Sequence, residues 1–216
     1  MSTFTEAASS ARVPVIADVF ASSRVRTALM VLGGALFTAL MAQVTIPMTP
    51  VPMTGQTLAV VLVGASLGWK RGAAALALYV FLGFFLPFYA DGSSGAENVL
   101  QVGSIAGATA GYLIGFIFAA GIVGWFAEHG SDRRVLSAFL SFVLGQLVIF
   151  AFGLAGLKLA APELVEAGFM TSANWSTVIH DGFTIFIVGG LVKAAFGALL
   201  MPAAWKILEA NGDVRD

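Results

Sequence analysis

Long apolar runs separated by short polar gaps dominate the chain. Six such runs cover residues 28–43, 56–67, 73–89, 105–127, 135–160 and 182–205. Because a helix needs about 20 apolar residues to cross a bilayer, these runs predict an all-α integral membrane protein with six transmembrane helices in one bundle. The second run is too short to cross the roughly 30 Å hydrocarbon core by itself. We expect a membrane domain over residues 27–208, flanked by cytoplasmic tails at 1–26 and 209–216.

Basic residues fall in every second gap between these runs. They are Arg24, Arg26, Lys70, Arg71, Arg133, Arg134 and Lys206. The intervening gaps, residues 45–55, 90–104 and 161–181, contain neither Lys nor Arg. Positive charge collects on the cytoplasmic side of membrane proteins. The distribution therefore predicts a multi-pass protein of the cell membrane with both termini in the cytoplasm, N-in and C-in.

Composition narrows the class of protein further. Hydrophobic residues make up 58% of the chain and charged residues only 11%, against about 25% charged in soluble domains, so the lipid bilayer is the expected environment. With no cysteine, two histidines and no HExxH pattern, neither a metal site nor a bound cofactor is predicted. Too few basic residues lie outside the gaps to form a nucleic-acid surface. The sequence also lacks the GxxxxGK[ST] motif of nucleotide-binding P-loops.

The segment between the first two runs, residues 45–57, contains three prolines and no charge. Proline forbids a regular helix and biases the preceding residue towards extended backbone. Since non-helical backbone is tolerated at membrane depth where it lines a cavity, we interpret this external loop as a cavity lining or a lid. A solvated connector is the alternative. Thr54 and Gln56 bring hydrogen-bonding groups to the start of the next helix.

Lys193 is the one basic residue near the middle of an apolar run. A charge there costs roughly 2.5–3.5 kcal/mol on insertion scales, so such residues normally face a polar cavity. It lies about 16 Å inside its helix at 1.5 Å per residue, and the nearby helical segments contain no Asp or Glu. We expect an acidic small molecule to supply the counter-charge. A neutral lysine, or one bonded to backbone carbonyls, is the alternative. Gly190, one turn away, lets a ligand approach the backbone.

Other polar and small residues stand out within the runs. Gln146 needs hydrogen-bond partners if it is buried, so it either holds two helices together or faces a ligand. Tyr112 opens the fourth helix near its external side, where tyrosine is common as an interface anchor.

Ala35 and Ala39 lie four residues apart, and small residues at this spacing let helices approach closely. This spacing favours either packing within the bundle or docking onto another membrane subunit.

Three segments carry motifs of one known family. Residues 43–57 look like that family's loop after its first helix. Residues 107–116, GATAGYLIGF, are similar to its G-x-T-x-G-Y-L-x-G-F signature, and residues 188–194, VGGLVKA, match the segment of its sixth helix that usually reads P-G-D-x-x-K. On these motifs the chain resembles the BioY family, the biotin-binding membrane subunits (S components) of energy-coupling factor transporters. The likeness spans most of residues 24–208.

The resemblance implies a six-helix S component that binds biotin from outside, beneath the loop at residues 47–52. Lys193 then corresponds to the family's ligand-site lysine. Ala35 and Ala39 match an A-x-x-x-A face that docks a transmembrane T component, and this component carries two cytoplasmic ATPase subunits.

Gly190 departs from the family pattern, because the family normally has Asp there. A carboxylate three residues before Lys193 would share its helix face, pair with it and accept hydrogen bonds from ureido N–H groups. We expect Gln146 or a loop carboxylate such as Asp91 to compensate, or the affinity or selectivity to have changed. The expected ligand-binding residues are Lys193, Gln56, Thr54, Tyr112, Gln146, Gly190 and Asp91, and no residue is expected to be catalytic.

Two other functions are open on the residues alone. Residues 92–95, GSSG, fit a GxSG motif, and Ser94 with His180 would form the dyad of a rhomboid-like intramembrane serine protease if the two side chains came within hydrogen-bond reach. A stand-alone transporter of a small anion or vitamin is the other alternative, although neither inverted repeats nor a charged pore ring is evident.

Overall fold

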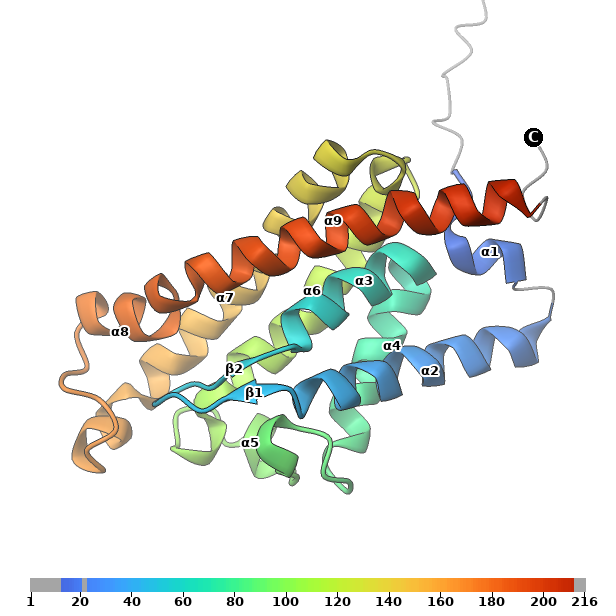
Figure 1. Ribbon diagram of the computed structural model, residues 1–216. Coiled ribbons are helices and arrows are strands. Elements are labelled where there is room, and N and C mark those ends of the chain that lie inside the picture. Colours follow the sequence, from blue (N-terminus) through green and yellow to red (C-terminus); the bar gives the residue numbers. More distant parts are fainter. Residues whose placement is uncertain (1–12, 21–22, 212–216) are drawn as a thin grey trace, which may run out of the picture.

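The structure, a computed structural model, describes residues 13–20 and 23–211 and is predominantly helical (Figure 1). The longer helices are α2 (Arg24–Ala42), α3 (Gln56–Leu67), α4 (Trp69–Leu82), α6 (Ala110–Ala127), α7 (Val135–Glu166) and α9 (Ile187–Ala210). Short helices and 3-10 turns complete the chain: α1 (Ile16–Phe20), η1 (Ala90–Gly92), α5 (Glu97–Leu100), η2 (Ala106–Thr109), η3 (Ser131–Arg133), α8 (Trp175–Gly182) and η4 (Thr184–Phe186). Each predicted apolar run overlaps one of the longer helices.

The longer helices differ in length, and not all of them are long enough to cross a membrane. In the described part of the chain, four segments are long and apolar enough to cross a membrane: Arg24–Ala42, Ala106–Ala127, Val135–Glu166 and Trp175–Ala210. The helices α3 and α4 have only 12 and 14 residues, which corresponds to about 18 and 21 Å of rise. The third run predicted a helix to residue 89, but α4 ends at Leu82. Gly83 weakens the helix there, and Pro87 disfavours helical backbone before it.

The proline-rich loop forms an antiparallel hairpin, so the structure is not purely α. Strand β1 (Thr45–Ile46) pairs with β2 (Met53–Thr54), with Thr45 opposite Thr54 and Ile46 opposite Met53. Figure 1 shows the hairpin continuing from α2 and leading into α3. Val51, between the strands, is buried. The loop therefore enters the bundle, as its lack of charge predicts, and we call this end of the molecule the hairpin end.

The helix α6 is the most enclosed of the four long segments. In its most apolar window 61% of the residues are buried, against 28–39% in the other three. Gly111 shows how α6 packs, because a Cβ at this position would lie 2.2 Å from the carbonyl oxygen of Phe152 on α7. Only glycine allows the two helices to approach this closely. Gly111 therefore serves the close packing of α6 on α7 within the bundle.

Ala35 and Ala39 lie on the inner side of α2. They are 0% and 7% exposed, whereas the neighbouring Leu36 and Leu40 are 47% and 67% exposed. The alternation places leucine, and not alanine, on the outer face of α2. The internal-packing alternative therefore describes this pair. Their role in docking a partner stays a prediction, and in this conformation the bundle covers both side chains.

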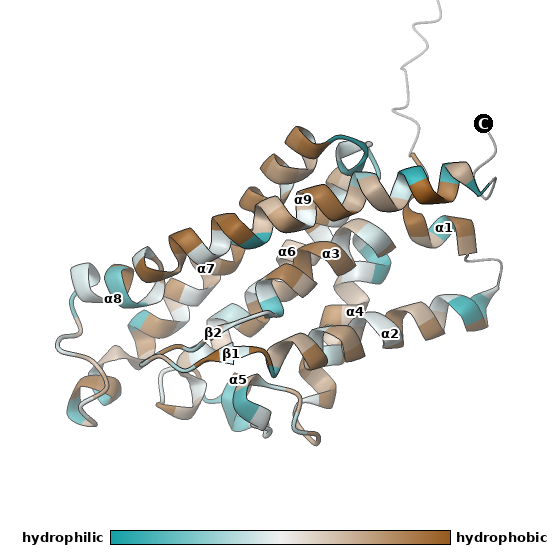
Figure 2. Ribbon diagram, viewed as in Figure 1, coloured by the Kyte–Doolittle hydropathy of each residue, from teal (hydrophilic) through white to brown (hydrophobic). Residues whose placement is uncertain are grey.

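Most of the length of the long helices has the colour of hydrophobic residues in Figure 2, and many of their large apolar side chains are exposed. On α9, for example, Val188, Val192 and Phe196 are each more than half exposed. Soluble monomers rarely expose contiguous apolar surface of this kind. In a bilayer the same side chains contact lipid, which agrees with the membrane class predicted from the apolar runs.

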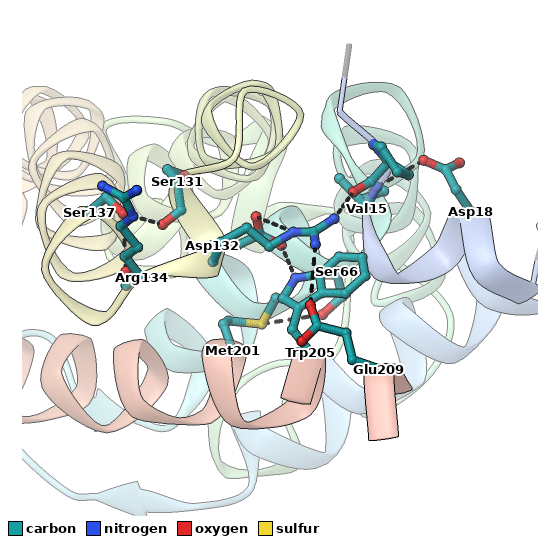
Figure 3. A network of polar contacts seen from close by, with 12 residues as sticks. Val15, Asp18, Ser66, Ser131, Asp132, Arg134, Ser137, Met201, Trp205 and Glu209 are labelled. Carbon is teal, nitrogen blue, oxygen red and sulfur yellow. Dashed lines mark hydrogen bonds and ion pairs between the residues drawn. The ribbon is translucent and has the colours of Figure 1, made fainter. Parts of the chain in front are cut away.

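Charged and polar side chains close the other end of the bundle, which we call the basic end (Figure 3). The Arg71 guanidinium donates a hydrogen bond to Asp18 Oδ1 over 2.6 Å, which ties α1 to α4. Trp205 Nε1 donates to Asp132 Oδ2 over 2.5 Å, and the Arg133 guanidinium lies 3.4 Å from the Trp205 ring. Arg133 also donates to the carbonyl oxygen of Pro14 over 3.0 Å, in the segment that leads into α1. Basic residues from the start of α4, from η3 and from the end of α9 thus lie at one end of the bundle, as the charge pattern predicts.

Residues 13–20, part of the predicted N-terminal tail, pack against the basic end. Val13 N donates to Glu128 O over 2.7 Å, and Val15 and Ala17 are buried. This part of the tail therefore belongs to the folded bundle. Residues 1–12, 21–22 and 212–216, which make up much of the two predicted tails, lie outside the described residues.

Candidate ligand-binding site

A cavity of about 330 Å³ lies at the hairpin end, between the hairpin, the starts of α3 and α6, and α7 and α9. Its volume falls within the range of about 300–1,000 Å³ that is typical of small-molecule sites. Six of the seven predicted ligand-binding residues line it: Thr54, Gln56, Asp91, Tyr112, Gly190 and Lys193. The fold therefore brings together residues from four separate regions of the sequence.

Lys193 on α9 supplies the cation of the cavity. Its Nζ donates to the carbonyl oxygen of Thr54 over 2.6 Å and to Thr57 Oγ1 over 3.1 Å. Among the described residues, no carboxylate forms an ion pair with it. An ammonium group has three donors, so one N–H has no hydrogen-bond partner among the described residues. The alternative in which Lys193 is bonded to a backbone carbonyl is thus met in part, and no carboxylate of the described chain supplies a counter-charge.

A short chain of hydrogen bonds holds the polar wall in place at the start of α3. Thr54 Oγ1 donates to Gln56 Oε1 over 2.7 Å, and Gln56 Nε2 donates to the Tyr79 hydroxyl over 2.5 Å. Tyr79, on α4, is fully buried. The Gln56 amide is therefore fixed before any ligand arrives, and a preorganised donor loses little conformational entropy on binding.

Aromatic rings form the apolar wall. The rings of Tyr112 and Phe150 meet edge to face with centroids 6.4 Å apart, and Phe186 lies 6.1 Å from Phe150. The Tyr112 hydroxyl donates to the Gly182 carbonyl oxygen over 2.8 Å. Because that hydroxyl already has a partner, Tyr112 offers the cavity its ring, which suits the apolar body of a ligand.

Several lining residues were not singled out by the sequence pattern. They include Tyr89, Asn98, Phe116, Phe150 and Phe186. The chain has 18 phenylalanines, and an apolar run does not separate those that face lipid from those that face a cavity. Phe150 and the exposed Phe196, for example, both lie within apolar runs of the sequence.

Asp91 lies in the lining near the surface, in the turn η1. It is exposed and has a left-handed φ of 56°. Asn98 is close by in the chain and donates to the carbonyl oxygens of Ser94 and Gly95 over 3.0 and 3.3 Å. The structure thus places a carboxylate at the outer part of the cavity, and Lys193 on α9 forms no ion pair with it.

Gln146 is the predicted ligand residue that does not line the cavity. Its Nε2 donates to the Gly190 carbonyl oxygen over 2.9 Å, which links α7 to α9. It lines instead a smaller cavity of about 80 Å³ on the other side of Gly190. The helix-holding alternative therefore describes Gln146 in this structure.

Ser94 and His180 do not form a dyad. His180 Nδ1 lies 2.7 Å from Asp181 Oδ1, and no hydrogen bond joins His180 to Ser94 within the described residues. Both residues are exposed on surface segments. The arrangement lacks the nucleophile–base contact that a serine protease needs.

These features define a class. The chain is a multi-pass membrane protein in which short and long helices enclose a ligand-binding cavity at one end of the bundle.

The chain belongs to the BioY family, which it matches over residues 10–210. The biotin transporter BioY2 of Lactococcus lactis subsp. cremoris is 31% identical over 175 residues, covering 79% of this chain and 87% of that protein. The biotin transporter BioY of Thermotoga maritima is 34% identical over 169 residues, covering 76% and 89%. The crystal structure of an S-component for biotin from an ECF-type ABC transporter has a similar fold, with a TM-score of 0.68 at 20% identity over 85% of this chain and 92% of that chain.

Proposed function

We propose that the chain is the substrate-binding membrane subunit, or S component, for uptake of biotin. The observation that carries the proposal is the cation of the cavity: Lys193 lines it and has no carboxylate partner in the part of the chain that the structure describes. Relatives that are 31–34% identical are named biotin transporters, and the solved structure with a similar fold is an S-component for biotin.

The geometry supports a ligand with an apolar body and polar ends. The rings of Tyr112, Phe150 and Phe186 suit the apolar body. Lys193 and the Gln56 amide supply donors for its polar atoms. Biotin carries a carboxylate and a ureido carbonyl, and both accept hydrogen bonds from such donors.

The proposed topology has α2, α3, α4, α6, α7 and α9 as six membrane helices that together cover the proposed membrane domain at residues 27–208, with both termini in the cytoplasm. The basic end then faces the cytoplasm, in agreement with the bias of positive charge, and the cavity opens to the outside. The short α3 is completed by the hairpin, whose non-helical backbone lines the cavity and not the lipid.

Transport in this proposal depends on partner proteins, because the chain has no P-loop motif of its own. We infer a transmembrane T component and two ATPase subunits. Since the bundle covers Ala35 and Ala39, the partner-facing surface is not assigned to these two side chains. No catalytic residue is proposed in this chain.

Binding of biotin to the purified, detergent-solubilised protein tests the proposal by calorimetry. We expect saturable binding by the native chain and at least about tenfold weaker binding, about 1.4 kcal/mol, by Lys193→Met, which keeps the apolar stem. Lys206→Met changes an exposed lysine at the basic end and should bind like the native chain. No binding by the native chain would overturn the function, and full affinity in a folded Lys193→Met protein would overturn the role of Lys193.

Uptake assays separate an S component from a stand-alone transporter. We expect cells that express the chain to accumulate biotin only when the T component and the ATPases are also present. Accumulation in cells that lack every partner ATPase would favour the stand-alone alternative.

A further inference from the structure

The helix α8 lies at the hairpin end, in the chain segment that leads into α9 (Figure 1). The helical backbone is interrupted between the two, because Phe183 has φ −140° and ψ −56° and the 3-10 turn η4 follows. With 24 residues, α9 alone extends over about 36 Å, which exceeds the roughly 30 Å of a hydrocarbon core. The last membrane crossing therefore does not need α8, which is free to take another direction.

The side chains of α8 fall on distinct faces of the helix. Trp175 and Ile179, four residues apart and thus on one face, are 53% and 42% exposed. Ser176 and His180 share the neighbouring face and are also exposed, while Val178 is buried against the bundle. An exposed apolar face beside an exposed polar face suits neither the hydrocarbon core nor water alone. The membrane–water interface accommodates both faces at once.

The chain that follows α8 leads directly into a lipid-facing helix. Ile187 and Val188, at the start of α9, are 37% and 73% exposed, and in a membrane protein this outer surface contacts lipid. Tryptophan, which is enriched where membrane and water meet, comes 12 residues earlier in the chain, at Trp175. The occupant that the exposed apolar face of α8 fits is therefore the same bilayer, at the level of its interface.

Lys158, on α7, connects this helix to the start of α8. It lies near the end of the apolar run at residues 135–160. Its Nζ donates to the carbonyl oxygen of Ala173, in the loop before α8, and lies 5.5 Å from the centre of the Trp175 ring, within reach of a cation–π contact. It forms no ion pair with a residue that the structure describes. A lysine in the outer part of a membrane helix runs its stem along apolar surface and places its ammonium at the interface.

We propose that α8 is an interfacial anchor that lies on the surface of the bilayer. Trp175 and Ile179 insert among the lipids, Ser176 and His180 face water, and Lys158 tethers the start of the helix at this depth. That the anchor lies on the outer surface rests on the proposed topology, whereas its place at the interface does not depend on topology or ligand.

Spin-label accessibility in phosphatidylcholine nanodiscs tests the depth of α8. The chain has no cysteine, so each single-cysteine variant carries one label: Trp175→Cys, Ile179→Cys, Ser176→Cys and His180→Cys. The measurement is the ratio of collisions with oxygen, which partitions into lipid, to collisions with a water-soluble nickel chelate. We expect this ratio to be at least about twofold higher at positions 175 and 179 than at positions 176 and 180.

Two further variants calibrate the ratio. Val192→Cys, at an exposed position on α9, is the reference for lipid, and Ser94→Cys, in an exposed loop at the hairpin end, is the reference for water. Ratios at 175 and 179 equal to the Ser94→Cys value would overturn the anchor, because that face would then lie in water and be open to a protein partner. Ratios at all four positions equal to the Val192→Cys value would overturn it too, because α8 would then lie in the hydrocarbon core.

Lys158→Met tests the tether, since methionine keeps an apolar stem and loses the ammonium. With the label at Ile179→Cys, we expect a narrower central line of the spectrum, which reports a more mobile α8. Lys158→Arg keeps the charge and the donors and should retain the line width of the unchanged lysine. Lys70→Met is the matched control at the basic end, where the Lys70 ammonium lies 5.1 Å from the centre of the Trp69 ring, and it should leave the line unchanged.

An unchanged line width in Lys158→Met would overturn the role of Lys158, while the accessibility ratios still decide where α8 lies. None of these measurements uses biotin, so failure of the proposed function and failure of the anchor are seen separately.

Discussion

Buried polar side chains have different partners at the basic end and at the hairpin end of the bundle. At the basic end, Trp205 donates to Asp132 at 2.5 Å and covers the Arg133 guanidinium at 3.4 Å, and the segment around α1 packs against them. At the hairpin end, Lys193 donates to Thr54 and Thr57 and borders a cavity of about 330 Å³. The charged groups of the basic end contact other side chains of the bundle, although Asp132 Oδ1 and Arg133 Nε form no hydrogen bond with described residues. At the hairpin end, Lys193 has no carboxylate partner among the described residues.

The difference separates two roles of polar groups in an apolar bundle. A side chain whose bonds are all made within the chain contributes to folding, and its loss should lower stability. A side chain that retains an unused donor contributes to binding, and its loss should lower affinity more than stability. Substitutions at the two ends are therefore expected to affect different measurements.

The largest effect on stability is expected from Trp205→Ala. Trp205 is one of the largest fully buried side chains, and truncation of a buried tryptophan costs about 3 kcal/mol or more. We expect a large fall in the melting temperature in detergent, with unchanged biotin affinity of the protein that remains folded. Trp125→Ala, at an exposed tryptophan, is the control and should melt near the native value. A biotin affinity that fell together with stability would remove the distinction between the two ends.

An intermediate effect is expected from Gln56→Ala at the hairpin end. The change removes the amide that Thr54 and Tyr79 hold beside the cavity. We expect about fivefold weaker biotin binding, equivalent to about 1 kcal/mol, measured by calorimetry. Gln101→Ala changes an exposed glutamine at the same end and should leave binding unchanged. Native affinity in Gln56→Ala would show that this amide does not reach the ligand.

The smallest effect on stability is expected from the titration of the Asp132 carboxyl group. Burial raises the pKa of this carboxyl above its reference of 3.8, although the Trp205 hydrogen bond and Arg133 act in the opposite direction. Because the folded state disfavours the charged form, the native chain should gain stability as the pH falls through the raised pKa towards 3.8. Asp132→Asn lacks this carboxyl group, so the melting temperature of the native chain should rise relative to that of Asp132→Asn over this pH range. Parallel melting curves for the two proteins at every pH would contradict the prediction.

The apolar runs and the placement of charges were sufficient to predict the membrane class, the approximate positions of the six longer helices, the gathering of basic residues at one end, and Lys193 as a cavity residue. These features depend on the free energy of placing each residue in lipid or water, which is a property of the residue and its near neighbours in sequence. For the same reason the charge-free, proline-rich loop predicted a segment that enters the bundle.

The tertiary structure alone decided which side of a helix each residue faces. Ala35 and Ala39 match a docking motif but lie inside, Phe150 lines the cavity while Phe196 faces outwards, and Gln146 binds Gly190 instead of lining the main cavity. These outcomes depend on the rotation and spacing of helices that are distant in sequence, at distances such as the 2.4 Å between Gln146 Oε1 and a Cβ at Gly190. Lipid and a protein interior are equally apolar. A hydrophobic pattern therefore does not tell which side of a helix faces the bundle, and it contains no distances between helices.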